Sequence, residues 1–104
     1  MKRRRHYEIE LTHEADRHLA GLSARERATV LESLEKRLAY DPTVETRNRK
    51  PLRPNPVAPW ELRIGRLRVY FDVEQEPRHV VRVQAVGIKD GNRVWIGGEE
   101  VELK

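Results

Sequence analysis

The chain has 104 residues, no cysteine and a formal net charge of +4, and charged side chains make up 37% of it. This length suffices for one domain around one modest core, and it excludes two separate functional units. Without cysteine, disulfides and thiolate metal sites are excluded, and no apolar run approaches the roughly 18 residues that span a bilayer. We therefore expect a cytoplasmic protein that is neither secreted nor inserted in a membrane.

The first part of the chain predicts one strand and two helices, with the strand at residues 7–11, where apolar and acidic side chains alternate. Thr12 is expected to cap the first helix. Ser23 and Glu26 form a capping-box pattern for the second helix, which Pro42 stops. An apolar stripe at helical spacing is expected on the second helix, formed by Ala28, Leu31, Leu34 and Leu38. Because the link between the helices is short, we expect an antiparallel helical hairpin packed on a sheet.

The rest of the chain predicts one long loop and a run of antiparallel strands. Residues 41–59 hold five of the six prolines and are expected to form an irregular loop. Strands are predicted at about 60–64, 67–74, 80–88 and 92–96. A basic arm at 1–6 and an acidic tail at 97–104 flank this single domain. The predicted fold class is therefore α+β, with an N-terminal strand, a two-helix hairpin and a three- to four-stranded antiparallel meander.

The most informative feature is the pair Arg63 and Arg68, which a tight turn at residues 65–66 places directly opposite each other. Facing like charges destabilise a sheet, so this register favours an anion between them. Glu61 and Tyr70 are expected on the same face, while the other face is apolar and packs on the helices. The arginine face is then exposed, and a shift of the turn by one residue would move both arginines inward.

Positive charge is concentrated around this hairpin. Between residues 47 and 68 seven cations stand against one acid, which favours phosphate over a neutral ligand. Arginine outnumbers lysine by 16 to 5, and the base composition of the source genome explains this number at least as well as phosphate binding does. An alternative is a solvated strand face whose charges are balanced by neighbouring acids or counterions. The candidate nucleic-acid-binding residues are Arg47, Arg49, Lys50, Arg53, Arg82 and Trp95.

Three short segments then carry a family resemblance: RKPLRPN at residues 49–55, WELRIGRLRVY at 60–70 and AVGIK at 85–89. With the order of the elements, they resemble the RelE/ParE superfamily toxins of bacterial toxin–antitoxin systems, over residues 7 to about 95. The resemblance implies, for a RelE-like member, a ribosome-dependent endonuclease that cleaves messenger RNA without metal or cofactor and so inhibits translation. In that reaction the 2′-hydroxyl of the messenger attacks the adjacent phosphate.

The resemblance also implies roles for individual residues. Arg68 matches the hairpin arginine that contacts the scissile phosphate, and Arg63 matches a basic position on the preceding strand. Lys89 stands where RelE-like members often carry a second phosphate-binding arginine, although lysine lacks the bidentate fork. The tyrosine that the nuclease branch places near the end of the last strand corresponds to Trp95. Indole stacks on a base but has no useful acid–base chemistry.

The remaining catalytic roles need a base for the 2′-hydroxyl and an acid for the departing 5′-oxygen. Glu61 is the candidate base because it lies on the arginine face, and Tyr70, its neighbour across the strands, is the candidate proton donor. No spacing of histidines suggests a metal site.

Three functions stay open at this point. The first is the endonuclease toxin. The second is a non-catalytic RNA- or DNA-binding partner of an antitoxin, and the third is a ParE-like gyrase poison. The expected partners are a cognate antitoxin, the ribosome and messenger RNA, with operator DNA bound through the antitoxin and no membrane partner.

Overall fold

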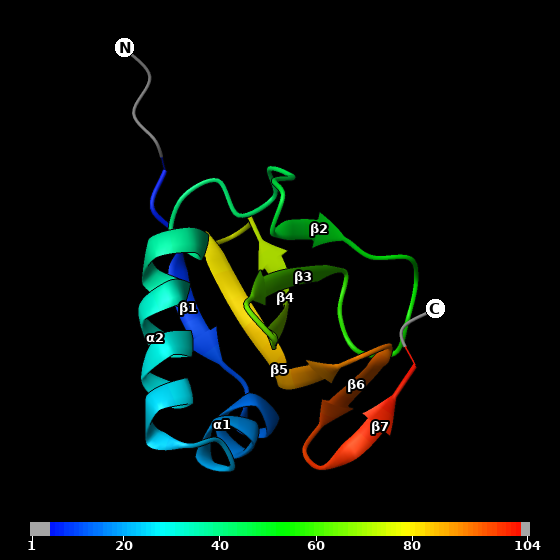
Figure 1. Ribbon diagram of the computed structural model, residues 1–104. Helices are drawn as coiled ribbons and strands as arrows, with labels where there is room; N and C mark the ends of the chain where they lie inside the picture. The colour runs from blue at the N-terminus through cyan, green and yellow to red at the C-terminus, as the bar shows by residue number, and fades with distance from the viewer. Residues whose placement is uncertain (1–4, 103–104) are drawn as a thin grey trace.

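A computed structural model describes residues 5–102, in which two helices pack on one face of a curled sheet (Figure 1). The elements in chain order are β1 (Glu8–Leu11), α1 (His13–Ala20), α2 (Ala24–Leu38), β2 (Arg49–Pro51), β3 (Trp60–Ile64), β4 (Leu67–Glu74), β5 (Val80–Asp90), β6 (Arg93–Ile96) and β7 (Glu99–Val101). Strand, helical hairpin and meander follow one another as expected, which confirms the α+β fold class. Neither helix of this range is long and apolar enough to cross a membrane.

Both helices begin at the caps that the sequence predicts. The Thr12 hydroxyl accepts a hydrogen bond from the backbone N–H of Ala15. Ser23 and Glu26 form the full capping box, in which each side chain accepts from the backbone N–H of the other. The second helix ends at Leu38, slightly earlier than Pro42 alone requires. Side-chain oxygens therefore satisfy N–H groups that would otherwise be unpaired at the start of each helix.

The sheet has the order β2-β3-β4-β5-β6-β7, and β1 pairs with β5. The pairs from β2 to β7 are antiparallel, whereas β1 runs parallel to the first half of β5. β6 pairs with the last four residues of β5, 87–90. One edge of β5 is thus shared between a parallel and an antiparallel neighbour, and α1 lies next to the gap between them (Figure 1).

The helix face of the sheet carries the main core, but the buried stripe of α2 differs from the expectation. Val30, Leu34 and Leu38 are buried, whereas Ala28 is exposed and the exposed fraction of Leu31 is 43%. Positions 30, 34 and 38 lie in one i, i+4 row on the helix surface. Relative to the predicted orientation, the helix is therefore rotated about its axis so that Val30 faces the sheet. The predicted membership of Ala28 and Leu31 in the core was wrong.

The opposite face of the sheet is also partly covered, which corrects the expectation of an exposed face. A second, smaller core lies there around Tyr70, Ala85, Ala58 and Ile96. The segment after β2 and the β6–β7 hairpin supply its remaining apolar side chains, Leu52, Val57, Val94 and Val101. Because the sheet curls at both ends, only part of the arginine face reaches solvent.

Two segments expected to be irregular contain strands. The proline-rich loop at 41–59 includes β2, which pairs with β3. The acidic tail at 97–104 includes β7, because Gly97 and Gly98, with φ of 60° and 82°, form a hairpin turn instead of ending the sheet. Of the predicted basic arm at 1–6, residues 1–4 lie outside the described range.

Candidate nucleic-acid interface

The β3–β4 hairpin has the predicted register. Arg63 lies opposite Arg68, and Glu61 lies opposite Tyr70. Gly65 has a φ of 58°, so the first residue of the turn uses the left-handed conformation that glycine adopts without strain. The predicted register is therefore confirmed, whereas the predicted exposure of both arginines is not, because Arg68 is buried.

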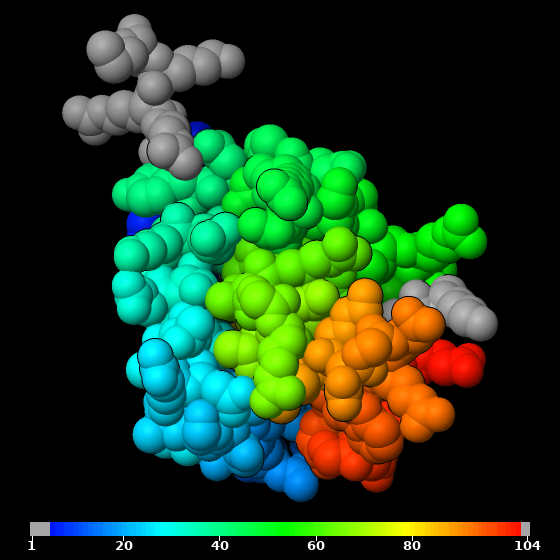
Figure 2. Space-filling view, viewed as in Figure 1, coloured from blue at the N-terminus to red at the C-terminus, as the bar shows by residue number. Residues whose placement is uncertain are grey.

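A cavity of about 450 Å³ opens beside this hairpin, and we call it the cationic cleft. It is lined by Leu52, Glu61, Arg63, Arg68, Lys89, Asn92, Arg93, Val94, Glu100, Val101 and Glu102. The hairpin turn and the β5–β6 end of the sheet lie side by side at the surface (Figure 2), tied by a 2.8 Å hydrogen bond from Lys89 N–H to the Arg66 carbonyl. The cleft thus brings Arg63, Arg68 and Lys89 together.

Arg93 is a cleft residue that the sequence reasoning missed. It lies on β6 opposite Asp90, and its Nε lies 3.5 Å from a carboxylate oxygen of Glu100 on β7. The sequence signal that predicts this position is the tight turn at residues 91–92, because it folds the following strand back beside Lys89. Four cations and three acids therefore line the cleft.

The two facing arginines are held in different ways. The Nε of Arg63 donates to the Glu61 carboxylate at 2.9 Å, and the exposed fractions of these two side chains are 44% and 8%. Arg68 is buried, and its Nη1 donates to the carbonyls of Gly65 at 2.7 Å and Leu67 at 2.9 Å. A carboxylate and two carbonyl dipoles thus balance the pair internally, so an anion is not required between them. The structure supports the alternative that neighbouring acids offset part of the charge.

Tyr70 lies beneath the cleft and does not line it. Its side chain is fully buried, and its hydroxyl has no hydrogen-bond partner within residues 5–102. Burial raises the pKa of Tyr70 well above its usual value, and the Glu61 carboxylate raises it further. The hydroxyl therefore stays protonated but does not line the cleft, which counts against the predicted role as direct proton donor.

The other predicted nucleic-acid-binding residues are dispersed. Arg49 is buried, and its guanidinium donates to the carbonyls of Val44 and Arg37, so it ties the end of α2 to the following loop. Lys50 pairs with Glu45 at 3.1 Å. Arg47 and Arg53 are exposed, and neither of them lines the cleft.

Arg82 lies toward the other end of β5. Its guanidinium contacts Glu10 at 3.3 Å and Glu74 at 3.6 Å. Five residues separate it from Gly87, the partner of Arg68, which corresponds to roughly 16 Å along a strand. Arg82 therefore belongs to a separate ion-pair cluster and does not extend the cationic cleft.

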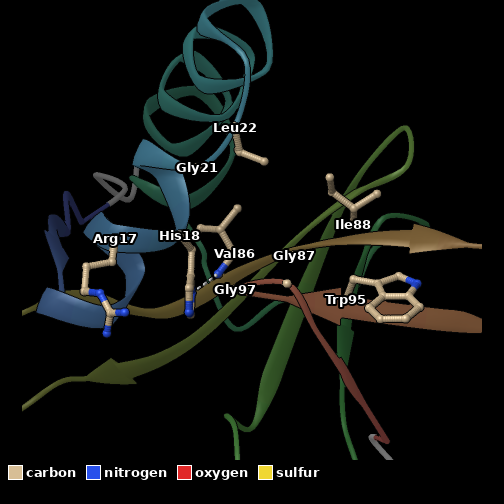
Figure 3. A pocket seen from close by; sticks show the side chains of 10 residues that line it. Arg17, His18, Gly21, Leu22, Val86, Gly87, Ile88, Trp95 and Gly97 are labelled. Carbon is tan, nitrogen blue, oxygen red and sulfur yellow. Dashed lines mark hydrogen bonds between the residues drawn. The ribbon is translucent and has the colours of Figure 1, made fainter.

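Trp95 lies on the helix side of the sheet, away from the arginine pair. It lines a second cavity, of about 390 Å³, between α1 and β6 (Figure 3). Its neighbour across the strands is Ile88, which packs on the main core. The position that corresponds to the family tyrosine is thus outside the cleft, and Trp95 and Arg68 do not share a site.

The described residues contain no group of three or more histidine, cysteine, aspartate or glutamate side chains that could hold a metal ion.

The fold and the cleft define a small α+β protein with a basic hairpin. It is similar to one chain of the RelBE2 toxin–antitoxin complex of Mycobacterium tuberculosis, with a TM-score of 0.72 and 26% identity, over 86% of this chain and 98% of that chain. No protein-family model and no curated protein matches the sequence significantly. The structural likeness confirms the RelE/ParE resemblance. The chain is a RelE-type toxin.

Proposed function

We propose that this toxin binds the RNA backbone in the cationic cleft and cleaves messenger RNA on the ribosome without a metal. The observation that carries the proposal is the convergence of Arg63, Arg68 and Lys89 from three adjacent strands on one cavity of about 450 Å³. Three cations in a partly enclosed site favour a phosphate group and stabilise the charge that develops on it. Two carbonyls fix Arg68 in advance, so little side-chain entropy is lost when a phosphate binds.

In the proposed reaction the 2′-oxygen of the messenger forms a bond to the adjacent phosphorus, and the bond from phosphorus to the 5′-oxygen breaks. Glu61 accepts the proton of the 2′-hydroxyl, and the Lys89 ammonium supplies one to the departing 5′-oxygen. A substrate phosphate competes with the Glu61 carboxylate for Arg63, whose side chain is already 44% exposed. When Arg63 turns to the phosphate, Glu61 is released to act as the base. The products are a 2′,3′-cyclic phosphate and a 5′-hydroxyl.

The test is translation in a purified system, with 5′ ends of the messenger mapped after addition of wild type, Arg68→Ala or Arg47→Ala. Arg47 is the matched control, because it is an exposed arginine outside the cleft lining. We expect wild type and Arg47→Ala to arrest elongation with new 5′-hydroxyl ends, and Arg68→Ala to do neither. Unchanged messenger with wild type would reject the nuclease.

A non-catalytic RNA-binding inhibitor is the second candidate, and one observation favours it. Glu61 is already paired with Arg63 at 2.9 Å, and no histidine or tyrosine lines the cleft. The variant Glu61→Gln separates the two candidates, because it keeps the shape of the side chain but cannot act as a base. If cleavage stops while RNA binding persists, the nuclease is supported. If translation is blocked equally by both proteins without cleavage, the inhibitor is supported.

We infer that the partner is a cognate antitoxin, since the similar structure is a toxin–antitoxin complex. Acidic side chains of such a partner would compete with RNA for Arg63 and Lys89, and operator DNA would be bound through the antitoxin. Co-expression with the product of a neighbouring gene tests this inference. Copurification and loss of toxicity are expected, and a toxin that elutes alone and stays toxic would count against it.

A further inference from the structure

The second cavity has an aromatic wall that the fold does not use. The exposed fraction of Trp95 is 37%, and within residues 5–102 no aromatic ring packs against its indole. Trp60, by contrast, stacks on Phe71. An indole that is left partly exposed beside a cavity offers a flat surface for a planar ligand.

A hydrogen-bond donor faces the same cavity. The backbone N–H of Val86 donates to Nδ1 of His18 at 3.2 Å, as the dashed line in Figure 3 shows. Burial lowers the pKa of His18, so the ring is neutral near pH 7. A neutral imidazole that accepts at Nδ1 carries its proton on Nε2. That N–H makes no hydrogen bond within the described part of the chain.

The opposite wall places no side chain against this donor. A Cβ built on Gly97 would lie 3.2 Å from Nε2 of His18, so any other residue would crowd the imidazole there. Gly98 continues this wall, and a Cβ on it would meet nothing within 4 Å. Both glycines are also needed for the turn, with φ of 60° and 82°. The turn therefore keeps the space between His18 and Trp95 free of side chains (Figure 3).

A cation stands at the rim. The guanidinium of Arg17 pairs with Glu14 at 3.2 Å on the surface of α1, and the exposed fraction of the arginine side chain is 66%. Exposed pairs of this kind contribute roughly 0–1 kcal/mol, so Arg17 can readily exchange Glu14 for an anion. The cavity volume of about 390 Å³ falls within the roughly 300–1,000 Å³ usual for small-molecule sites.

We propose that this cavity binds a purine nucleotide, and we call it the tryptophan pocket (Arg17, His18, Trp95, Gly97, Gly98). The base stacks on Trp95, one of its ring or carbonyl acceptors takes the Nε2–H of His18, and the phosphate pairs with Arg17. A purine presents a larger π-face than a pyrimidine and has acceptors along its edge. The unpaired donor and the rim cation favour a nucleotide over the apolar side chain of a protein partner. The pocket lies on the opposite face of the sheet from the cationic cleft and does not depend on the function proposed for the cleft.

The test is an NMR titration of the isotope-labelled full chain with guanosine 5′-monophosphate at millimolar concentration. We expect shifts of the Trp95 indole N–H and of the Gly97 and Gly98 amides, with the Trp60 indole unmoved as an internal control. Trp95→Leu keeps an apolar side chain but removes the stacking surface, and roughly 5- to 150-fold weaker binding is expected. Arg63→Ala, in the cationic cleft, should bind the nucleotide as wild type does.

Three results would overturn the proposal. The first is an absence of shifts at the tryptophan pocket, or shifts that occur only around the cationic cleft. The second is an equal effect of ribose 5-phosphate, which would leave an anion site without base recognition. The third is that a purified antitoxin, but no nucleotide, perturbs the Trp95 and Gly97 signals, which would assign the pocket to a protein interface. None of these results bears on cleavage by Arg68 and Glu61, so each proposal can fail alone.

Discussion

Replacement of Arg49 by methionine tests whether a buried arginine of the basic segment holds the fold together or binds nucleic acid. Arg49 lies opposite Leu62 on β2, with an exposed fraction of 8%. Its Nε donates to the Val44 carbonyl at 2.7 Å and its Nη1 donates to the Arg37 carbonyl at the end of α2. Methionine keeps much of the apolar stem and removes the guanidinium, so the two carbonyls lose their charged donor.

The expected loss of stability follows from these two bonds. Each hydrogen bond to a charged group contributes about 1.5–3 kcal/mol, and these two bonds set the scale of the loss. The methionine variant does not have to bury a charged group, and the absence of this desolvation cost offsets part of the loss in stability. We therefore expect the free energy of unfolding of Arg49→Met to fall by about 2–3 kcal/mol. For a domain of this size that corresponds to a drop of about 10–20 °C in Tm.

The measurement is urea unfolding followed by circular dichroism, with RNA affinity measured by filter binding at one salt concentration. Arg47→Met is the matched control, because Arg47 lies on the same segment but is exposed, and its change should stay within about 0.5 kcal/mol. Unchanged stability of Arg49→Met together with weaker RNA binding would refute the structural role and restore Arg49 as a nucleic-acid ligand.

Three further predictions concern stability. Gly87→Ala should lower the free energy of unfolding by about 1–3 kcal/mol in urea, because its Cβ would lie 2.7 Å from the backbone oxygen of Trp95; Gly21→Ala, with contacts no closer than 3.5 Å, should be nearly neutral. Tyr70→Phe should leave calorimetric stability unchanged or raised by up to about 1 kcal/mol, since the buried hydroxyl has no partner, and a clear loss would reveal a bond to the neighbouring carboxylate. Because burial lowers the pKa of His18 in the folded state, the unfolded chain binds more protons, so stability should fall as pH drops below about 6.5 and level off below the folded pKa. His18→Gln should lack that part of the pH dependence, and an identical slope in both proteins would contradict the assignment.

Local chemistry made several features predictable from sequence. The turn at residues 65–66 has a glycine at its first position, and this sets the register that pairs Arg63 with Arg68. Thr12 and Ser23 supply side-chain oxygens directly before helical runs, so both helix starts were found. Lys89 could be placed on the face of the arginine pair because β5 continues past Gly87 and its side chains keep alternating between the two faces of the sheet.

The sequence-based predictions that failed concern features that depend on contacts between distant segments of the chain. Nothing around Arg49 in the sequence shows that the end of α2 lies beside it, so a buried anchor was taken for a nucleic-acid ligand. Tyr70 is on the predicted face, but the curl of the sheet that covers it comes from apolar side chains near both ends of the sheet. Trp95 was assigned by alignment to a family position, and only the pairing of β6 with β5 shows that it faces the helices.

The pairing of β1 with β5 has a consequence for how the toxin matures. Residues 8–11 find their partners only at residues 80–83, and the Thr12 hydroxyl bonds to the carbonyl of Gln84. Contacts between such distant segments form slowly and require the later one to have left the ribosome. Lys89 and Arg93 are synthesised later still, so a nascent chain has an incomplete cleft until these residues have left the ribosome. An antitoxin that recognises the finished sheet would thus bind each toxin molecule only after β1 and β5 have paired.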